Sequence, residues 1–583
     1  MNILKFPNVN ESVRDLRKLL TDVLVIGSEG AGARAALAAS EAGKKVAVIT
    51  KGRVGKSGAT QCIPGDYAIN SNSACRLGLP GDPDDDWRKH YRDTLEAGKW
   101  LNDPLLAQTL AENAEDGLSF LKSLNVEWTR LGQYPGHSYP RSAMVGEVGK
   151  TGPALLSGLH RAMHCKDIAL IEDTLAIELL VSEGRVNGCL AFFIPSGEFF
   201  VIEAQAVILA TGGGSRIYWL TSGPEELTGD GMAMAYRAGA ELIDMEFVQF
   251  SPFTIVWPSG LRGHMSFVYE YMCVLQSWLL NSLGERYMER WDPERMERST
   301  RDYLSIGMMD EIISGRSSEH GGVYLSLSHL PMNLIDQFEA HHFPGLKVGE
   351  FKLSDFGVDP KEKAFEIAPG AHYFMGGVRI DGRGATTVPG LFAAGEVTGG
   401  VHGANRISGN AITDTQVFGA IAGAAAAEYC THSERIDINA DQVIAVINEI
   451  EQGISRSEGV STFNVRGALQ QTAWNQVGVI RNKKGLEQAL SKIHDWEDQV
   501  GNSLCIRTKD PVFNIELIKA IELKNMLIVL QAITMSALSR DKTCGAHFRS
   551  DSNEQADASH RYITRCESGK MTIISLPAPE TEQ

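Results

Sequence analysis

A histidine, an arginine and two glycine-rich turns lie close together in the stretch 368–419. His372 precedes a Met-Gly-Gly turn, an apolar segment then ends in Gly-Glu at Glu396, and Arg406 follows in a second glycine-rich turn. Glycines at a strand-to-helix turn let backbone N–H groups approach a phosphate or a ring closely. An arginine and a histidine beside such a turn suit a carboxylate ligand. An ordinary surface turn with a solvated arginine is the alternative interpretation.

A strand–turn–helix–strand pattern near the start of the chain is typical of dinucleotide-binding folds. The apolar segment 22–26 leads into a glycine-rich turn, 27–32, then a predicted helix and a second strand at 45–49. The match to G-x-G-x-x-G is imperfect because Glu29 takes the second glycine position. The second strand ends in Thr50-Lys51 rather than in an acid for the ribose. Any other βαβ unit is the alternative.

A second apolar strand, predicted over 201–209, runs into Ala210-Thr211-Gly212-Gly213. Glycines at the end of a buried strand let it approach the adenosine half of a dinucleotide. Together with the first turn and the Gly-Glu segment at Glu396, this pattern predicts FAD as the cofactor.

Composition excludes several classes of partner. The net charge of −17 argues against nucleic acid. Nine scattered cysteines without a C-x-x-C pair indicate neither a zinc nor an iron–sulfur site, so no metal site is predicted, and they suit reduced thiols in a cytoplasm. Residues 1–20 are polar and charged, unlike a signal peptide. The apolar runs fall short of the roughly 20 residues that a bilayer span needs, so direct membrane insertion is not expected.

Three segments carry a resemblance to a known family. They are Ala368–Gly377, with His-Tyr-Phe-Met-Gly-Gly; Leu391–Glu396; and His402–Arg406, with His-Gly-Ala-Asn-Arg. The chain resembles, over nearly its whole length, the flavoproteins of succinate dehydrogenase, fumarate reductase and L-aspartate oxidase. The resemblance implies an α/β fold with a Rossmann-like FAD-binding domain, an inserted α+β capping domain and a C-terminal helical domain. The expected bounds are a short helical leader at 1–20, the FAD-binding domain at 21–250 and 358–429, the capping domain at 251–357, the helical domain at 430–550 and a tail at 551–583.

The resemblance also bears on how FAD is held. In succinate dehydrogenases the stretch that matches 56–60 reads R-S-H-T, and its histidine is bonded covalently to the flavin. Gly58 or Ala59 stands there in this chain, so we expect non-covalent FAD, which favours reduction or oxidation by a strong acceptor. The pattern and the resemblance together predict these cofactor-binding residues: Gly27, Glu29, Gly30, Ala31, Gly32, Thr50, Lys51, Ser57, Gly58, Ala59, Thr60, Ala210, Thr211, Gly212, Gly213, Asp230, Glu396, Asn405, Arg406, Ala411 and Ile412.

The catalytic residues are carried over from the same resemblance. Arg301, in an Arg-Asp pair, matches the family's proton-transferring arginine, and Glu270 matches a relay acid. An arginine is ordinarily too basic for acid–base work, so this role rests on the resemblance alone. His372 and Arg406 match the pair that clamps one substrate carboxylate. A salt-bridged helix arginine and structural hydrogen bonding are the alternatives for these residues.

Three departures from the family pattern concern the other half of the substrate. Ser251 replaces a histidine and Tyr269 a threonine that hold the second carboxylate, and Cys273 replaces a relay arginine. Loss of a charged partner for a buried carboxylate costs several kcal/mol. We therefore expect Ser251 and Tyr269 to face a substrate other than succinate or fumarate, unless Arg262 and His264 restore the positive charge.

The sequence as a whole predicts an FAD-dependent oxidoreductase that hydrogenates or dehydrogenates a C–C bond next to a carboxylate. The alternatives are a fumarate reductase or succinate dehydrogenase flavoprotein subunit, an L-aspartate oxidase, and a non-catalytic flavin subunit that transfers electrons. A separate electron donor or acceptor is expected, such as an iron–sulfur subunit. The expected location is the cytoplasm, or the membrane periphery through a partner.

Overall fold

A parallel five-stranded sheet carries the predicted glycine-rich turns at its strand ends. The computed structural model describes residues 16–62, 65–146, 151–265, 268, 271–272, 275–342, 359, 362–552 and 558–580. Parallel strands covered on both faces are continuous apolar runs, and four of these five strands are entirely buried. In spatial order the strands are β18 (Leu391–Ala393), β11 (Ala206–Leu209), β2 (Val23–Ile26), β3 (Val46–Ile49) and β7 (Ile168–Ile171).

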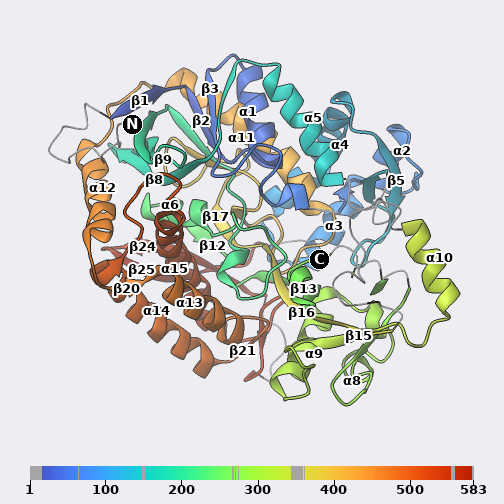
Figure 1. The fold of residues 1–583 in the computed structure, drawn as a ribbon. Helices are drawn as coiled ribbons and strands as arrows, with labels where there is room; N and C mark the ends of the chain where they lie inside the picture. Colours follow the sequence, from blue (N-terminus) through green and yellow to red (C-terminus); the bar gives the residue numbers. More distant parts are fainter. Residues whose placement is uncertain are drawn as a thin grey trace.

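Helices α1 (Gly30–Glu41) and α11 (Asn410–His432) pack closely together beside this sheet (Figure 1). Their contact depends on glycine, because a Cβ at Gly423 would lie 2.3 Å from the carbonyl oxygen of Ala35. Segments about 390 residues apart in sequence therefore form one layer. The remaining elements around them are α2 (Ser71–Arg76), α3 (Trp87–Ala97), α4 (Pro104–Ser123), α5 (Thr151–His164), α6 (Asp230–Arg237), and the small sheet of β4 (Tyr67–Ala68), β6 (Ser142–Val145) and β5 (Trp128–Gly132).

A second sheet corrects two expectations about the chain. The expected helical leader is wrong where the structure describes it, because Arg17–Leu20 is strand β1, paired in parallel with β10 (Glu198–Glu203). The single strand expected over 201–209 is two strands, β10 and β11, in different sheets. The other strands of this sheet are β9 (Arg185–Phe193) and β8 (Thr174–Ser182).

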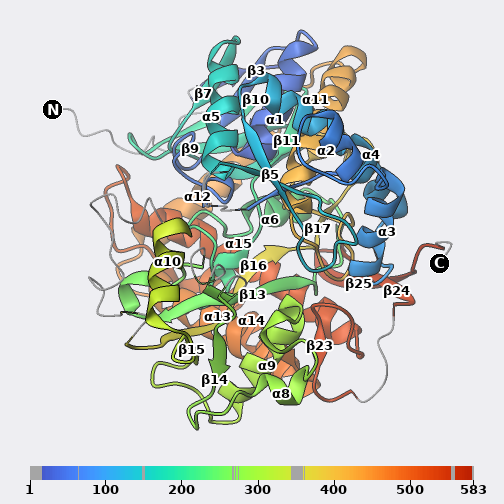
Figure 2. The same cartoon turned by 90° about the vertical axis from the view of Figure 1, so that its right-hand side faces the viewer.

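The inserted capping region has a sheet of its own (Figure 2). It also has a separate hydrophobic core. Strand β13 (Val248–Trp257) pairs with β16 (Phe365–Phe374), which brings His372 to its place near the end of that strand. Beside them lie β15 (Val323–Ser326), β14 (Trp278–Leu280), α8 (Met288–Trp291), α9 (Arg301–Ile313) and α10 (Met332–His342).

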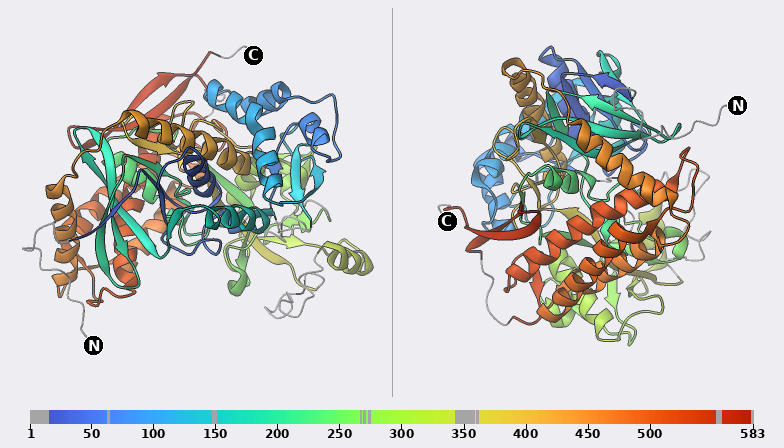
Figure 3. Two further views of the ribbon diagram at one scale, coloured as in Figure 1. Left: turned by 90° about the horizontal axis from the view of Figure 1, so that it is seen from above. Right: turned by 90° about the vertical axis from the view of Figure 1, so that its left-hand side faces the viewer.

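Helices dominate the C-terminal part (Figure 3). They are α12 (Ala440–Ser455), α13 (Thr462–Gln476), α14 (Lys483–Ser503) and α15 (Ile515–Ser539). Among the described residues, α15 alone is long and apolar enough to cross a membrane, whereas the sequence analysis expected every apolar run to be too short. Of its most apolar window, 72% is buried inside the protein, as expected of a core helix.

The end of the chain pairs with a strand that lies more than 300 positions earlier in the sequence. Its strands form a hairpin of β24 (His560–Glu567) and β25 (Lys570–Pro577) within the expected tail. The hairpin extends a sheet with β12 (Leu242–Ile243), β17 (Gly377–Arg379) and β19 (Thr398–Gly399). Short pairs complete the fold: β20 (Val460–Ser461) with β22 (Leu504–Cys505), and β21 (Ile480–Arg481) with β23 (Phe548–Arg549).

Candidate functional site

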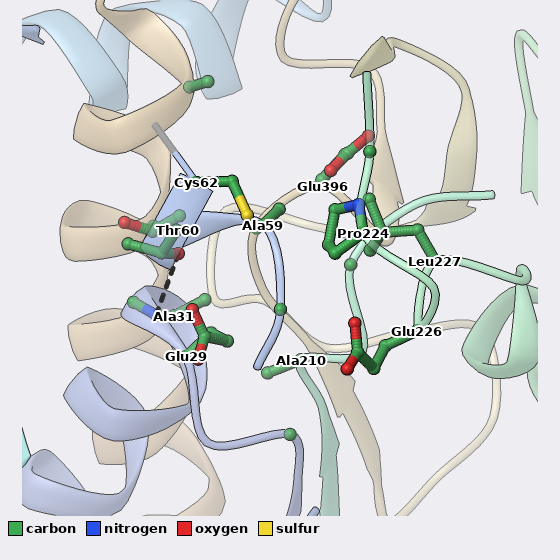
Figure 4. A pocket seen from close by; sticks show the side chains of 18 of the residues that line it. Glu29, Ala31, Ala59, Thr60, Cys62, Ala210, Pro224, Glu226, Leu227 and Glu396 are labelled. Carbon is green, nitrogen blue, oxygen red and sulfur yellow. Dashed lines mark hydrogen bonds between the residues drawn. The ribbon is translucent and has the colours of Figure 1, made fainter. Parts of the chain in front are cut away.

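A cavity of about 410 Å³ opens at the carboxyl ends of the central strands, where open α/β sheets bind ligands. The turn after β2 needs glycine there, since a Cβ at Gly27 would lie 2.1 Å from the carbonyl oxygen of Ala210 at the end of β11. In Figure 4, Glu29 and Thr60 lie on one side of the cavity and Pro224 on the other. Gly30 and Ala31, the first residues of α1, line this space, and helix N-termini favour anions.

Most predicted cofactor residues line this cavity. Of the others, Gly32 packs against the Gly27 carbonyl, Gly213 packs against Glu396, and Asn405 accepts a hydrogen bond from Gln249 at 2.9 Å. The predicted residues in the wall are Gly27, Glu29, Gly30, Ala31, Thr50, Lys51, Ser57, Gly58, Ala59, Thr60, Ala210, Thr211, Gly212, Asp230, Glu396, Arg406, Ala411 and Ile412. A wall built from glycine turns and a helix N-terminus fits a dinucleotide such as FAD.

Glu29 occupies the position where the dinucleotide pattern has glycine. Its Oε2 accepts a hydrogen bond from the backbone N–H of Gln61 at 3.3 Å. Burial, together with the nearby charge of Glu226, raises the pKa of Glu29 to about 8. The side chain is therefore largely a neutral carboxylic acid at pH 7, which lowers its repulsion of a phosphate.

Glu396 is a second carboxyl group in the cavity wall. The backbone N–H of Phe374 donates to its Oε1 at 3.1 Å. Burial raises the pKa of Glu396 to about 7, although this hydrogen bond and the charge of Arg406 oppose the rise. The group is thus poised between its two protonation states near neutral pH.

Three basic side chains from different elements line the same cavity. Arg301 begins α9 of the capping region, His372 lies near the end of β16, and Arg406 lies in the turn before α11. Burial lowers the pKa of Arg406 to about 10, and the charge of Arg301 adds to this effect. Burial and both arginines hold the pKa of His372 well below its usual 6.5, so the imidazole is neutral. The cluster is suited to an anion, above all a carboxylate.

Hydrogen bonds fix the orientation of His372 and Arg406. The Ser222 hydroxyl bonds His372 Nδ1 at 2.9 Å, which leaves Nε2 for a ligand. Arg406 Nη2 donates to Gln249 Oε1 at 2.9 Å, and its guanidinium lies 4.6 Å from the centre of the Tyr373 ring. The Tyr373 hydroxyl in turn lies 3.1 Å from His402 Nε2. These contacts hold the basic groups in place before any ligand arrives.

Several residues predicted to face the substrate lie elsewhere. Ser251 is fully buried within β13, where its hydroxyl accepts a hydrogen bond from the Phe253 N–H at 3.4 Å, and it is not part of the cavity wall. The guanidinium of Arg262 stacks on Trp219, 3.8 Å from the ring centre. Tyr269, Glu270 and Cys273 lie outside the described residues.

Sequence reasoning missed part of the wall. Tyr373 adjoins His372 in the His-Tyr motif, so that motif could have identified it. Other wall residues come from segments without a recognisable pattern, and only the fold brings them to the cavity. Among them are Asp66, Arg130, Tyr134, Met144, Thr174, Leu175, Ala176, Ser222, Glu226 and Met265.

Comparisons with known proteins agree with this site. Residues 22–412 match the model of an FAD binding domain, and residues 466–577 match that of the fumarate reductase flavoprotein C-terminus. The chain is 40% identical to a fumarate reductase (CoM/CoB) subunit of Methanothermobacter marburgensis, over 91% of this chain and 94% of the relative. It is 32% identical to the fumarate reductase flavoprotein subunit of Mycobacterium tuberculosis, over 96% and 97%. The solved Sdh1 of Mycobacterium smegmatis in complex with UQ1 superposes with a TM-score of 0.87 and 30% identity, covering 97% and 95% of the two chains.

These relatives overturn one expectation. The sequence predicted a substrate other than succinate and fumarate, but relatives matching over nine-tenths of the chain or more are fumarate reductase subunits. The expectation rested partly on Ser251, since its replacement of a histidine implies a charge lost from the substrate pocket. Because Ser251 does not line the cavity, its identity says little about charge around the substrate.

Proposed function

Because the chain belongs to the succinate dehydrogenase and fumarate reductase flavoprotein family, and is an FAD-dependent oxidoreductase acting on a CH–CH pair, we propose that it is the flavoprotein subunit of a fumarate reductase. The observation that carries the proposal is the cluster of Arg301, Arg406 and neutral His372 in the wall of the FAD cavity. The 40% identical relative from Methanothermobacter marburgensis is named for the same reaction.

Arg406, His372 and Arg301 have different roles in the proposed reduction of fumarate. When bound and reduced by the electron donor, the flavin would supply the hydride, and the second hydrogen would arrive as a proton. Arg406 and the Nε2–H of His372 donate charge-assisted hydrogen bonds to a carboxylate of fumarate. The resemblance assigns Arg301 to protonating the neighbouring carbon. Arg301 comes from the capping region, so closure of that region over the substrate would both deliver the proton donor and exclude water.

We propose that the flavin is held without a covalent bond. Gly58 and Ala59, which stand where relatives carry the attaching histidine, have no nucleophilic side chain, and both line the cavity. Gly58 also has a φ of +89°, and a Cβ there would lie 2.5 Å from Cγ of Glu29. A histidine at this position would therefore be strained in two ways.

Electrons must come from another protein or molecule. Within the described residues, no group of three or more His, Cys, Asp and Glu side chains could hold a metal ion. The relatives compared above include named subunits of larger enzymes. We propose a separate electron-carrying subunit, such as an iron–sulfur protein, and a cytoplasmic location, which the scattered free cysteines support.

Two measurements on the purified protein test the proposed flavin attachment and the proposed reaction. Acid-denatured protein should release its yellow colour into the supernatant, whereas flavin in the pellet would contradict the non-covalent attachment. A native sample is then photoreduced without oxygen and mixed with fumarate. Rapid reoxidation with one succinate formed per flavin is expected, and an Arg301→Ala sample serves as the control. Reduced flavin that persists with fumarate would refute the proposed reaction.

A further inference from the structure

The ammonium group of Lys51 is fully occupied within the protein. Its Nζ lies 2.7 Å from Asp230 Oδ2, 2.9 Å from Thr228 Oγ1 and 3.0 Å from Glu522 Oε1. A lysine ammonium has three donors and no acceptor. Every donor of Lys51 is thus used by a protein oxygen, although the residue lines the cavity. Lys51 is therefore better suited to fastening parts of the wall together than to contacting a phosphate.

One of these three oxygens comes from the C-terminal helices. Glu522 lies in α15, 471 positions from Lys51 in sequence, and its side chain is 2% exposed. Its second oxygen, Oε2, accepts from Lys519 at 2.9 Å and from Arg466 at 3.1 Å. Burial alone would raise the pKa of Glu522, but the three cations prevail and lower it. The carboxylate is thus charged at neutral pH and matched by neighbours.

The next turn of α15 contacts Asp230, the wall residue that also binds Lys51. Asn525 Nδ2 donates to Asp230 Oδ1 at 2.8 Å, and Asn525 Oδ1 accepts from Arg237 at 2.8 Å. Residues three apart face the same side of a helix. One face of α15 therefore binds both Lys51, which follows β3, and Asp230, which begins α6.

The contacts of Glu522 with Lys51 and of Asn525 with Asp230 lie at a defined part of the cofactor site. In dinucleotide-binding folds, the end of the second strand of the βαβ unit contacts the ribose of the adenosine half, and Lys51 follows that strand here. We propose that α15 forms the outer support of the adenosine half of the FAD site, with Glu522 as a positioning residue that acts through Lys51 and Asn525 as one that acts through Asp230. The inference rests on FAD as the cofactor and is independent of fumarate as the substrate.

Removal of the Glu522 charge should affect FAD binding in particular. Taking away one partner of a buried ion pair leaves the other uncompensated, so Lys51 would turn toward a new acceptor and disturb Asp230. The matched control is Glu225→Gln, because Glu225 also lies near Lys519 and Arg466 but is 63% exposed and is not part of the cavity wall.

The experiment measures flavin binding to apo-protein by the quenching of flavin fluorescence. We expect Glu522→Gln to raise the FAD dissociation constant at least tenfold and Glu225→Gln to change it less than twofold. In a Lys51→Met background, Glu522→Gln should add less than twofold. The dissociation constant of FMN, which lacks the adenosine half, should change less than twofold in every variant, and the absorption spectrum of the bound flavin should stay the same.

Three results would overturn the proposal. They are an unchanged FAD dissociation constant in Glu522→Gln, an equal loss of FMN affinity, and an undiminished effect of Glu522→Gln in the Lys51→Met background. The second would show a general loosening of the protein, and the third would show that Glu522 acts without Lys51. Should Glu522→Gln fail to fold by circular dichroism, Asn525→Ala takes its place, and unchanged FAD affinity in that variant would equally refute the role of α15.

Discussion

Replacement of Arg406 by methionine should change the free energy of unfolding only slightly but should lower kcat/KM for fumarate strongly. Arg406 is 8% exposed, and burial, aided by the charge of Arg301, lowers its pKa from the usual value of an arginine to about 10. This lowering corresponds to about 3 kcal/mol against the charged form in the unliganded protein. The substitution removes that cost, but it also removes hydrogen bonds to Gln249 and Ile407, at about 1 kcal/mol each. The free energy of unfolding should therefore change by less than about 2 kcal/mol.

The effect on catalysis should be far larger. A guanidinium that holds a carboxylate through two charge-assisted hydrogen bonds contributes about 1.5–3 kcal/mol for each bond. The loss of about 3–6 kcal/mol lowers kcat/KM for fumarate by a factor of about 10² to 10⁴. Arg406→Lys keeps the charge but loses the planar fork, so its activity should fall between that of the wild type and that of Arg406→Met.

The assay pairs urea unfolding of the apo-protein with steady-state reduction of fumarate by an artificial electron donor. FAD content is measured for each variant, because Arg406 also lines the cofactor cavity. Retention of kcat/KM within tenfold in Arg406→Met would refute the assignment of Arg406 to substrate binding. A loss of more than about 4 kcal/mol in the free energy of unfolding would instead refute the view that its buried charge is costly.

Three further outcomes are expected. Arg301→Ala should lower fumarate turnover by at least about 10³-fold while FAD stays bound, and near-normal turnover would remove Arg301 from the mechanism. The pKa of Glu29 is about 8 in the folded protein against 4.5 normally, so between these pH values the native state keeps a proton that the unfolded chain loses. As the pH rises from 4.5 to 8, the free energy of unfolding of the apo-protein should therefore fall by up to ~1.4 kcal/mol per pH unit. Glu396, whose pKa is raised to about 7, adds a slope of its own in every variant. In Glu29→Gln the slope measured by urea titration should therefore be smaller than in the wild type, above all between pH 7 and 8, and an unchanged slope there would mean that another group is responsible. Arg262→Ala should remove a cation–π contact with Trp219 worth about 0.5–1 kcal/mol; a higher KM for fumarate is expected, and an unchanged KM would show that this contact does not help to seat the capping region.

The cofactor turns were predictable because their chemistry is local. A phosphate or ring bound by backbone N–H groups needs glycine at fixed spacing, and Gly27, Gly30 and Gly212 line the cavity as expected. The family and the enzyme class followed from the motifs of residues 368–406, and the matches to the two family models confirm them. His372 and Arg406 were identified in this way too, and the structure brings both to the cavity wall together with Arg301.

Contacts between distant segments were not predictable. Ser251 looked like a substrate residue, but the pairing of β13 with β16 buries it away from the cavity. Arg262 was a candidate for the substrate's charge, yet it stacks on Trp219. Lys51 looked like a cofactor ligand, but Asp230, Thr228 and Glu522 use all its donors.

The sequence by itself determined the family and FAD as the cofactor, and it predicted which residues could hold a carboxylate, because glycine spacing and residue chemistry act over short stretches of chain. Only the tertiary structure decided which charged groups face the ligand and which are neutralised by one another. That decision depends on burial and on partners up to 471 positions away, and the direction of a side chain in a strand or helix follows from packing that no local pattern contains.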